Sequence, residues 1–423
     1  MSITRTARRH RPRPPTAAHR SLRVGAAARL GGVAEKASCR IGLGSGGVIG
    51  GRVMLALAPG TARELSRDRD VVLVSGTNGK TTTSSYLTAA LRVRSAVDSN
   101  EDGANTPNGL VRTLASGRAP VVVLETDEGW LPWALAQTGA RTAVLLNLSR
   151  DQLHRHHEVA ALASSWHRVL GGLEHAVANC DDPDVVFPAL AAHRRTWVSV
   201  GLRWTQDSQV CPRCGDECRH TGLDWGCGCG LRRPRPDWWL ESADLVSDSV
   251  RVTLDLGLPG RANLANAAMG VAAAAAAGVD PQAAADRLRD IHSVAGRYAV
   301  IDHHGRLTRL ILAKNPAGWV EALSMVASRT VPLVLAFNSE GVDGRDPSWL
   351  YDVPFAGVAG RPVVVTGRRA TDMLVRLEMA GLTDVRRAAD TRSALAMLPP
   401  GPVDLVANYT AFQSARRELR DAG

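Results

Sequence analysis

Lysine is scarce in this chain, and two of its lysines lie in segments suited to binding an anionic ligand. Of the 51 basic residues only three are lysine, namely Lys36, Lys80 and Lys314. A chain that uses arginine wherever a positive charge is sufficient should keep lysine where a compact ammonium group is needed. Lys80 and Lys314 are therefore candidate ligand-binding residues, and chance retention is the alternative for each.

Lys80 stands in a glycine-rich segment between an expected strand and an expected helix. The β-branched run 71–75 predicts a buried parallel strand, Gly76-Thr-Asn-Gly-Lys-Thr-Thr-Thr83 follows, and a helix should continue to about Arg94. In this arrangement backbone N–H groups and the helix N-terminus face phosphate, the lysine reaches the β- and γ-phosphates, and Thr81 can bind Mg²⁺. A plain turn would explain the glycines but not the lysine. The segment predicts an ATP site.

Five of the seven cysteines lie close together in the sequence, which is typical of a metal site. Clustered thiolates in a reducing compartment bind Zn²⁺ more often than they form structural disulfides, and four ligands complete a tetrahedral site. Free cysteines in a loop are the alternative. Cys211 and Cys214 form one pair across a short hairpin from the others, so the remaining ligands come from Cys218, Cys227 and Cys229.

The charge distribution argues against nucleic acid as the main ligand. Nine units of the net charge of +10 belong to residues 1–40, which carry nine Arg and one Lys against Glu35 alone, so the rest of the chain is close to neutral. With its prolines and no hydrophobic period, the segment 1–36 is predicted to be a disordered basic tail. No run is long and apolar enough for a membrane span, and we expect a cytoplasmic protein.

Alternating strand and helix patterns predict an α/β fold with more than one domain. Runs at 71–75, 121–124 and 142–146 alternate with helical segments, which predicts a doubly wound parallel sheet. A second α/β set has strands near 331–336, 362–366 and 403–407. We expect an ATP-binding domain over 37–296 with a cysteine insert at 208–237, and a smaller domain over 297–423. The glycine-rich stretch 41–51 is predicted to be a loop.

The segment Gly76 to Thr82 resembles the signature of the Mur ligase and folylpolyglutamate synthase superfamily, whose members form an acyl phosphate from ATP and a carboxylate. Other blocks follow in the order of that superfamily: Leu124-Glu-Thr-Asp-Glu128, Asn147-Leu-Ser-Arg-Asp-Gln-Leu-His154 and Gly260-Arg-Ala-Asn-Leu-Ala-Asn266. The resemblance implies Mg²⁺ on Thr81 and Glu125, and adenine beside Asn266. The ATP-binding residues it implies are Gly76, Thr77, Asn78, Gly79, Lys80, Thr81, Thr82, Asn266, Arg297 and Lys314.

Within this superfamily the chain resembles one family in particular, the MurT family. Its members are the ligase-like subunits of lipid II isoglutaminyl synthase. The blocks that carry it are Asp102-Gly-Ala-Asn105, the cysteine insert ending at Asp237, Ala313-Lys-Asn-Pro-Ala-Gly318 and Val342-Asp-Gly-Arg-Asp-Pro-Ser-Trp349. The family has Cys-x-x-Cys in the second cysteine pair, but residue 226 is glycine here. The resemblance therefore favours a structural Zn²⁺ site of Cys211, Cys214, Cys227 and Cys229, with Cys218 left over.

Several positions depart from the family pattern. His154 and Ser339 stand where aspartate is usual, and Tyr298-Ala299 replace an expected acid, so none of them is assigned a role. The chain has no lysine between Lys80 and Lys314, which excludes the carbamylated lysine that many Mur ligases use to bridge Mg²⁺.

The resemblance implies an ATP-dependent amidation of the D-glutamate α-carboxylate of lipid II, at the inner membrane face. Neither Cys39 nor Cys180 lies in a nucleophile turn, so ammonia must come from a separate glutaminase, which is GatD in this family. Asp343 and Asp346 are candidate catalytic acids together with Lys80, and capping the helix of Trp349 or pairing with Arg345 is their structural alternative. A stand-alone ligase that adds an amino acid remains the second hypothesis.

Overall fold

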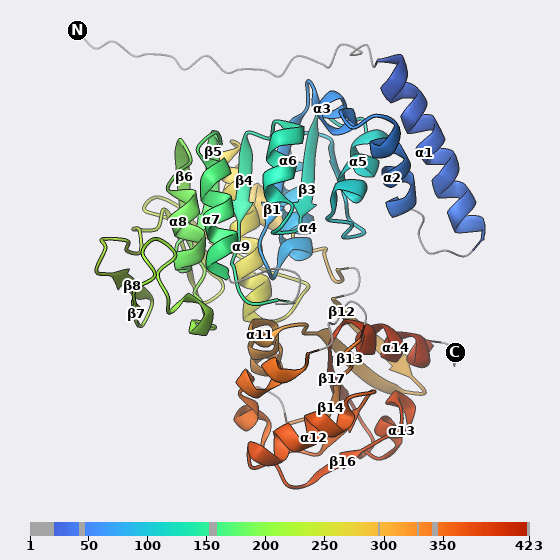
Figure 1. Ribbon diagram of the computed structural model, residues 1–423. Coiled ribbons are helices and arrows are strands. Elements are labelled where there is room, and N and C mark those ends of the chain that lie inside the picture. Colours follow the sequence, from blue (N-terminus) through green and yellow to red (C-terminus); the bar gives the residue numbers. More distant parts are fainter. Residues whose placement is uncertain are drawn as a thin grey trace.

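The computed structural model describes residues 21–41, 47–151, 159–294, 297–327, 330–340 and 346–420. Two sheets organise this part of the chain, one above the other in the view of Figure 1. The first is formed by the chain up to β11, and the second begins at β12. The pocket described below lies between them. The predicted α/β fold with a parallel sheet, a cysteine hairpin and a C-terminal domain is confirmed.

The first sheet has nine strands in the order β11-β10-β9-β6-β5-β4-β1-β3-β2. From the β2 edge of the sheet as far as β9, every strand is parallel to its neighbour. β10 is antiparallel to both β9 and β11. Their buried β-branched runs are what a sheet covered on both faces requires. The strands are β1 (Asp70–Ser75), β2 (Val97–Ser99), β3 (Val121–Thr126), β4 (Thr142–Leu145), β5 (His175–Asn179), β6 (Arg194–Ser199), β9 (Trp238–Glu241), β10 (Asp244–Val246) and β11 (Arg251–Thr253).

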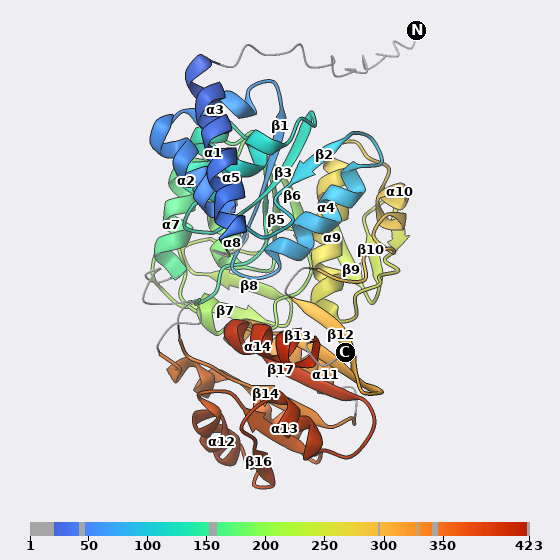
Figure 2. The ribbon, with the colours of Figure 1, turned by 90° about the vertical axis from the view of Figure 1, so that its right-hand side faces the viewer.

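Helices cover both faces of this sheet (Figure 2). One face carries α4 (Lys80–Leu91), α9 (Arg261–Ala276) and α10 (Pro281–Asp286). The small residues of α9 allow a close approach to α4: a Cβ placed at Gly270 would lie 3.2 Å from the Leu87 nitrogen. The other face carries α1 (Leu22–Arg40), α2 (Gly47–Leu57), α3 (Thr61–Ser66), α5 (Pro107–Ser116), α6 (Leu131–Thr138), α7 (Val159–Leu170) and α8 (Pro183–Ala189).

The second sheet has six strands in the order β12-β13-β17-β14-β15-β16, and all neighbours are parallel except β12 and β13. Its two faces are covered by separate apolar clusters. The elements are β12 (Tyr298–His303), β13 (Arg306–Leu312), α11 (Pro316–Ala327), β14 (Leu333–Ala336), η3 (Ser348–Asp352), η4 (Phe355–Val358), β15 (Val363–Thr366), α12 (Ala370–Met379), β16 (Val385–Arg387), α13 (Thr391–Ala396), β17 (Val403–Ala407) and α14 (Tyr409–Arg420).

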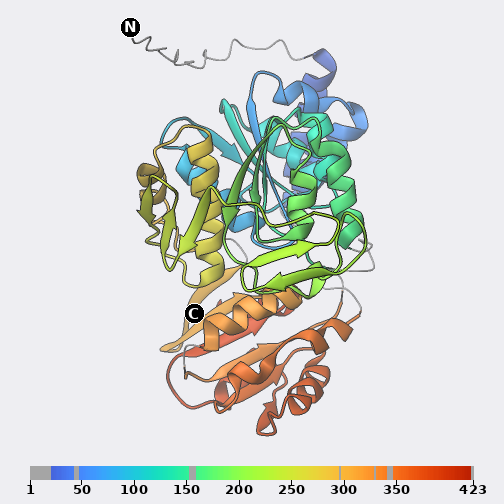
Figure 3. The ribbon, with the colours of Figure 1, turned by 90° about the vertical axis from the view of Figure 1, so that its left-hand side faces the viewer.

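The cysteine insert forms a small hairpin beside β5 and β6 (Figure 3). It follows the turn η1 (Gln206–Ser208) and consists of β7 (Cys218–Thr221) and β8 (Asp224–Cys227). The Trp225 indole N–H donates to the Cys180 carbonyl at 3.1 Å, and the Arg233 guanidinium pairs with buried Asp181 at 2.8 Å. These two contacts fix the hairpin to the first sheet.

Two predictions about the N-terminal region are wrong. The predicted disordered tail 1–36 includes most of α1, which begins at Leu22, and residues 1–20 lie outside the described residues. The predicted loop 41–51 includes the first turns of α2. Both helices were missed because their sequences contain several glycines, and glycine is a poor helix former. In the structure Gly31 and Gly50 lie at the contact between the two helices. A Cβ at Gly31 would lie 2.6 Å from Met54 Cγ and 2.7 Å from the Gly50 carbonyl oxygen.

Candidate active site

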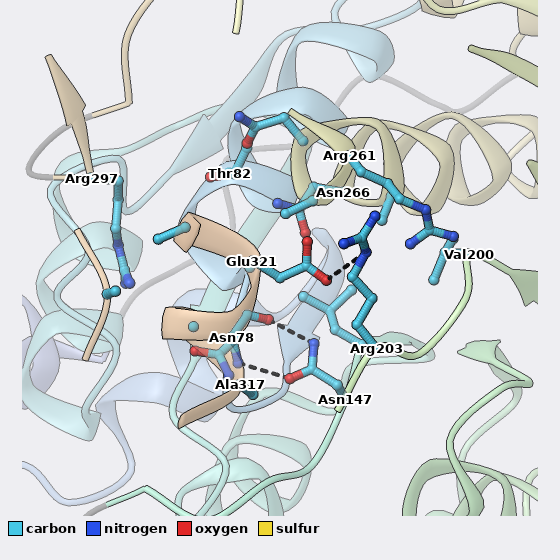
Figure 4. Close-up of a pocket in the computed structure, with 18 of the residues that line it drawn as sticks. Asn78, Thr82, Asn147, Val200, Arg203, Arg261, Asn266, Arg297, Ala317 and Glu321 are labelled. Atoms are coloured by element: carbon cyan, nitrogen blue, oxygen red, sulfur yellow. Dashed lines mark hydrogen bonds and ion pairs between the residues drawn. The ribbon is translucent and has the colours of Figure 1, made fainter. Parts of the chain in front are cut away.

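The glycine-rich segment after β1 forms a loop that the chain after β4 fastens in place. The Asn78 backbone N–H donates to Asn147 Oδ1 at 3.0 Å, and Asn147 Nδ2 donates back to the Asn78 carbonyl at 3.0 Å (Figure 4). Thr77 and Ser149 exchange a second pair of hydrogen bonds at 3.1 and 3.2 Å. Both segments follow neighbouring parallel strands, so the sheet itself brings them together. The loop is therefore held in shape by partners 69 to 72 residues away.

Gly79 is the residue that turns this loop into α4. Its φ is +85°, in the left-handed region that glycine adopts without strain. A Cβ there would also lie 2.2 Å from Asn266 Oδ1. Asn266, on α9, receives a hydrogen bond from the Thr83 hydroxyl at 3.3 Å. The structure thus places Asn266 directly against the loop. The contact of Asn266 with adenine stays a prediction.

Lys80 is buried at the start of α4 and faces Glu128, a residue that the sequence analysis gave no role. The Lys80 ammonium lies 2.8 Å from Glu128 Oε2 and donates to the carbonyls of Gly76 and Thr77. Burial alone would lower the pKa of Lys80, but the charges of Glu128, Asp127 and Glu125 raise it above its usual value. The side chain therefore remains a cation within the loop.

Thr81 and Glu125 both lie close to Gly103, in the turn that follows β2. A Cβ at Gly103 would be 3.9 Å from both Thr81 Oγ1 and Glu125 Oε2. Glu125 is 1% exposed; its Oε1 accepts from Asn105 at 3.1 Å, while Oε2 is buried with no hydrogen-bond partner among the described residues. An unpaired buried carboxylate oxygen next to a threonine hydroxyl fits a Mg²⁺ ion, which prefers oxygen ligands.

A pocket opens between the two sheets in front of this loop (Figure 4). We call the loop together with the residues that hold it (76–83, 128 and 147–149) the phosphate-loop wall, whether or not a residue reaches the pocket surface. The C-terminal wall is 297, 314 and α11 with the side chains that bridge to them, among them Arg203. Gly76, Thr77 and Lys80 lie in the loop but do not line the pocket. Seven of the ten predicted ATP-binding residues do line it: Asn78, Gly79, Thr81, Thr82, Asn266, Arg297 and Lys314.

Long polar side chains bridge the C-terminal wall and the first domain, from either side. The Arg297 guanidinium donates to Thr81 Oγ1 at 3.1 Å, and Lys314 pairs with Asp151 at 3.1 Å. Arg203 donates to Ser324 Oγ at 2.6 Å. Its guanidinium also lies 3.9 Å from Glu321, whose pKa is raised by burial against the opposing effect of Arg203 and Arg261.

A further bridge fixes the chain before α7 to the segment after β14. The Arg150 guanidinium pairs with Asp207 at 2.6 Å and with Asp352 on η3 at 2.9 Å. Arg150 also lies over the Trp204 ring, 5.8 Å from its centroid. Asp352 follows the Asp-Gly-Arg-Asp block in the sequence, so this bridge anchors the chain just after that block.

The two candidate catalytic acids differ in what the structure says of them. Asp343 lies outside the described residues. Asp346 is exposed, and its Oδ1 accepts the Ser348 backbone N–H at 2.9 Å, which with a side-chain hydrogen bond from Ser348 lowers its pKa. Asp346 does not line the pocket. Its contacts are those of a residue that caps a turn, the structural alternative named above.

The four cysteines favoured as Zn²⁺ ligands come together in the hairpin. The sulfur atoms of Cys211, Cys214, Cys227 and Cys229 all lie within 4.8 Å of one another, with Cys214 and Cys227 at 3.5 Å. Such a set of thiols fits a tetrahedral Zn²⁺ site. Cys218 is instead buried in an apolar cluster with Trp225 and Leu231.

Sequence reasoning missed several polar residues of the site. Glu128 had a usable signal, because it lies three residues after Glu125 at the end of the same strand. Arg261 also had one, because it lies in the block Gly260 to Asn266 quoted above. Arg203 and Glu321 had none, since nothing in their local sequence marks a ligand-facing position.

Comparison with known proteins agrees with this site. The Mur ligase middle domain family matches residues 74–274, and the MurT ligase C-terminal family matches residues 312–412. Together these two matches to Mur-type ligase domains cover most of the chain. Its C-terminal region is of the MurT type, which confirms the resemblance drawn from the sequence.

Curated relatives carry the MurT name, and solved structures show the same fold. Lipid II isoglutaminyl synthase subunit MurT of Staphylococcus aureus (strain N315) is 26% identical over 94% of this chain and 98% of its own length. The subunit of the same name from Streptococcus pneumoniae (strain R6) is 25% identical over 80% and 83%. MurF from Acinetobacter baumannii has a TM-score of 0.66 at 16% identity, covering 89% of this chain and 80% of its own, which shows the Mur ligase fold.

Proposed function

We propose that this chain is the ligase subunit of a lipid II isoglutaminyl synthase, which amidates the D-glutamate α-carboxylate to D-isoglutamine through an acyl phosphate. The observation that carries the proposal is the pairing of a Mur-type phosphate loop with a MurT-type C-terminal domain, on two walls of one pocket. The likeness to MurT subunits over nearly the whole chain supports it.

The phosphate-loop wall would carry the first step, in which the carboxylate attacks the γ-phosphate of ATP. The backbone N–H groups of the loop and the N-terminus of α4 receive the phosphates, and the Lys80 ammonium offsets negative charge on the transferred group. Glu128 keeps this ammonium charged and fixes its position. Mg²⁺, bound by Thr81 and Glu125, would supply further neutralisation of phosphate charge.

The second step needs ammonia, and the cysteines of this chain are not arranged as a glutaminase. Cys180 is buried, and burial raises the pKa of its thiol far above the usual value. Cys39 is exposed on α1, and the other five belong to the hairpin. A glutaminase nucleophile needs an activating base beside it. We propose a separate GatD-type glutaminase subunit as the source of ammonia, with Asp343 orienting the amine.

A stand-alone ligase that joins an amino acid to a carboxylate is the alternative. The fold alone is compatible with it, because a UDP-N-acetylmuramoyl-L-alanyl-D-glutamate–2,6-diaminopimelate ligase shares this architecture. The MurT-type C-terminal domain favours the amidation.

The test is amidation of lipid II with ATP and Mg²⁺, followed by mass spectrometry of the stem peptide. Ammonium at high concentration should support amidation by this chain alone, and glutamine should do so only when a glutaminase subunit is added. Free amino acids should not be incorporated. Incorporation of an amino acid, with no amidation from ammonium, would establish the stand-alone ligase instead.

A further inference from the structure

The helix pair α1–α2 lies on the outer side of α5, far from the C-terminal domain (Figures 1 and 2). α1 packs on α2 through Val24, Ala27 and Gly31, while its opposite face is open to solvent. This face has no part in the pocket between the two domains. It is therefore a surface that the ligase reaction does not explain.

Large apolar side chains are concentrated on this surface. Leu30 and Val33 of α1 are 53% and 64% exposed, and Leu22 is 95% exposed. Positions 22, 26, 30, 33 and 37 recur at the helical period, so Ala26 and Ala37 complete one continuous stripe. The α1–α2 pair and its cap hold seven of the eighteen exposed large hydrophobic residues of the described chain: Leu22, Leu30, Val33, Ile41, Val48, Ile49 and Leu57. Such a concentration is typical of an interaction surface.

The charged residues beside this apolar stripe are almost all basic. The only acid on the two helices, Glu35, is paired with Arg112 at 3.0 Å. The sequence before α1 adds six arginines and no acid within residues 1–20. The exposed cations of the helix pair are Arg23, Arg29, Lys36, Arg40 and Arg52.

We propose that the α1–α2 surface binds the face of a bilayer that contains anionic lipids, with α1 lying in the plane of the interface. An amphipathic helix with an apolar stripe and flanking Lys and Arg binds this way: the stripe enters the headgroup boundary and the cations contact lipid phosphates. No helix in the described ranges is long and apolar enough to cross a membrane. A second copy of the chain would place arginine against arginine, and a nucleic acid would leave the apolar stripe unused.

A chain of contacts links this surface to the active site. Arg112 pairs with Glu35 of α1 and also with Asp102 at 2.6 Å. Asp102 precedes Gly103, which lies close to both Thr81 and Glu125. A bilayer at α1 would therefore bring a lipid-linked substrate towards this turn. That consequence rests on the proposed function, whereas binding to the bilayer does not.

The test is flotation of the full-length chain with vesicles, which requires no ligase activity. Phosphatidylcholine vesicles that contain phosphatidylglycerol should carry the protein to the top of the gradient, and pure phosphatidylcholine should carry much less. Binding should fall as salt is raised, because the basic residues contribute through a screened interaction. Equal binding to both kinds of vesicle, or no binding to either, would overturn the proposal.

A pair of matched variants separates the α1 stripe from a general effect of charge. Leu30→Asp with Val33→Asp should reduce the partition coefficient by about tenfold or more, since the stripe loses its apolar contact with the bilayer. Val375→Asp with Met379→Asp makes the same change at two exposed positions of α12, and should leave binding unchanged. Thermal melting of both variants shows whether they fold.

Two other outcomes would contradict the proposal. If the α1 variant floats normally and removal of residues 1–20 abolishes binding, the basic tail alone binds polyanions. If the wild-type chain is a dimer by light scattering and Leu30→Asp with Val33→Asp makes it monomeric without affecting flotation, a second copy covers the surface. A failure of flotation would leave the amidation assay untouched, so the two proposals fail separately.

Discussion

The phosphate-loop wall and the C-terminal wall of the pocket differ in how their side chains are held. Lys80 and Glu128 are 3% and 4% exposed, and the loop around them is fastened by reciprocal hydrogen bonds from the chain after β4. Lys314 and Arg203 are 23% and 42% exposed and reach across the pocket, Lys314 to Asp151 and Arg203 to Ser324 and Glu321. Such partly exposed bridges contribute little each. The first wall is therefore preformed, and the second depends on how the two domains meet.

If this comparison is right, substitutions in the phosphate-loop wall should cause the largest losses of activity and stability. Lys80→Ala removes the ammonium that meets the β- and γ-phosphates, so ATP turnover measured by phosphate release should be abolished. It also leaves Glu128 buried without its partner, which should lower the free energy of unfolding by about 3–5 kcal/mol. Lys80→Arg should be almost as inactive, because a planar guanidinium does not replace a point charge.

A double variant separates catalysis from stability in this test. Lys80→Met with Glu128→Gln removes both charges and should recover most of the stability but none of the activity. The pair lowers the pKa of Glu128 below its ordinary 4.5, against the effect of burial. Its stabilisation is present above that pH and is lost as the pH falls through the lowered value. A Lys80→Ala protein with wild-type turnover would refute the phosphate-loop assignment.

The next largest effect concerns the acid block of the C-terminal domain. Asp343→Asn should bind ATP normally but lose about a hundredfold or more of the amidation rate, with glutamine or with ammonium, if this carboxylate orients the amine. Asp346→Asn is the matched control: its carboxylate already accepts the Ser348 N–H, so amidation should be nearly unchanged.

Two results would change the role of Asp343. If ammonium restores the full rate of Asp343→Asn, the residue serves the partner's glutaminase or the passage of ammonia. If the variant is normal with both nitrogen sources, the block is structural.

The cysteine hairpin belongs with the preformed part of the molecule. The purified chain should contain about one Zn²⁺, and Cys214→Ser should lose it together with thermal stability, because the binding free energy of a structural metal contributes to folding. Cys218→Ser should keep the metal, since Cys218 is not among the four cysteines whose sulfur atoms lie within 4.8 Å of one another. Elemental analysis decides this: metal lost from Cys218→Ser but retained in Cys227→Ser would contradict the ligand set.

The same difference explains what could be predicted from the sequence. Residues of the phosphate loop lie together in one motif, and parallel strands bring Asn147 to the same edge of the sheet, so local patterns were sufficient. Glu128 was missed although it lies three residues after Glu125, because its role depends on Lys80, 48 residues away. Arg203 and Glu321 act through partners far along the chain, and no local pattern marks them. The helices α1 and α2 were missed for another reason. Glycines that weaken helix propensity are used there for close packing, so tertiary contact overrides the local signal.

A smaller effect is expected for Lys314 on the C-terminal wall. Lys314→Ala should raise the KM for ATP by about tenfold while the fold stays intact, because its ammonium lines the pocket and pairs with Asp151 across it. Asp151→Asn is informative beside it. If Lys314 binds ATP directly, Asp151→Asn should change KM little. If Lys314 acts only by holding the domains together, the two variants should have equal effects.

The smallest effect should come from Arg203, the most exposed of these bridges. Arg203→Ala removes the hydrogen bond to Ser324 and the long contact with Glu321, and should raise the KM for ATP by only about twofold to threefold. The increase should shrink at high salt, where the wild-type ion pair is already screened.

The same substitution removes a charge that opposes the effect of burial on Glu321, so the pKa of Glu321 should rise further above its usual value. Arg203→Ala should therefore change the pH dependence of the KM for ATP at the acidic end. When Glu321→Gln is also present, residue 321 cannot ionise, and that change should disappear. An effect of Arg203→Ala as large as that of Lys80→Ala would mean that the C-terminal wall is as rigidly built as the phosphate loop, and the contrast between the two walls would be wrong.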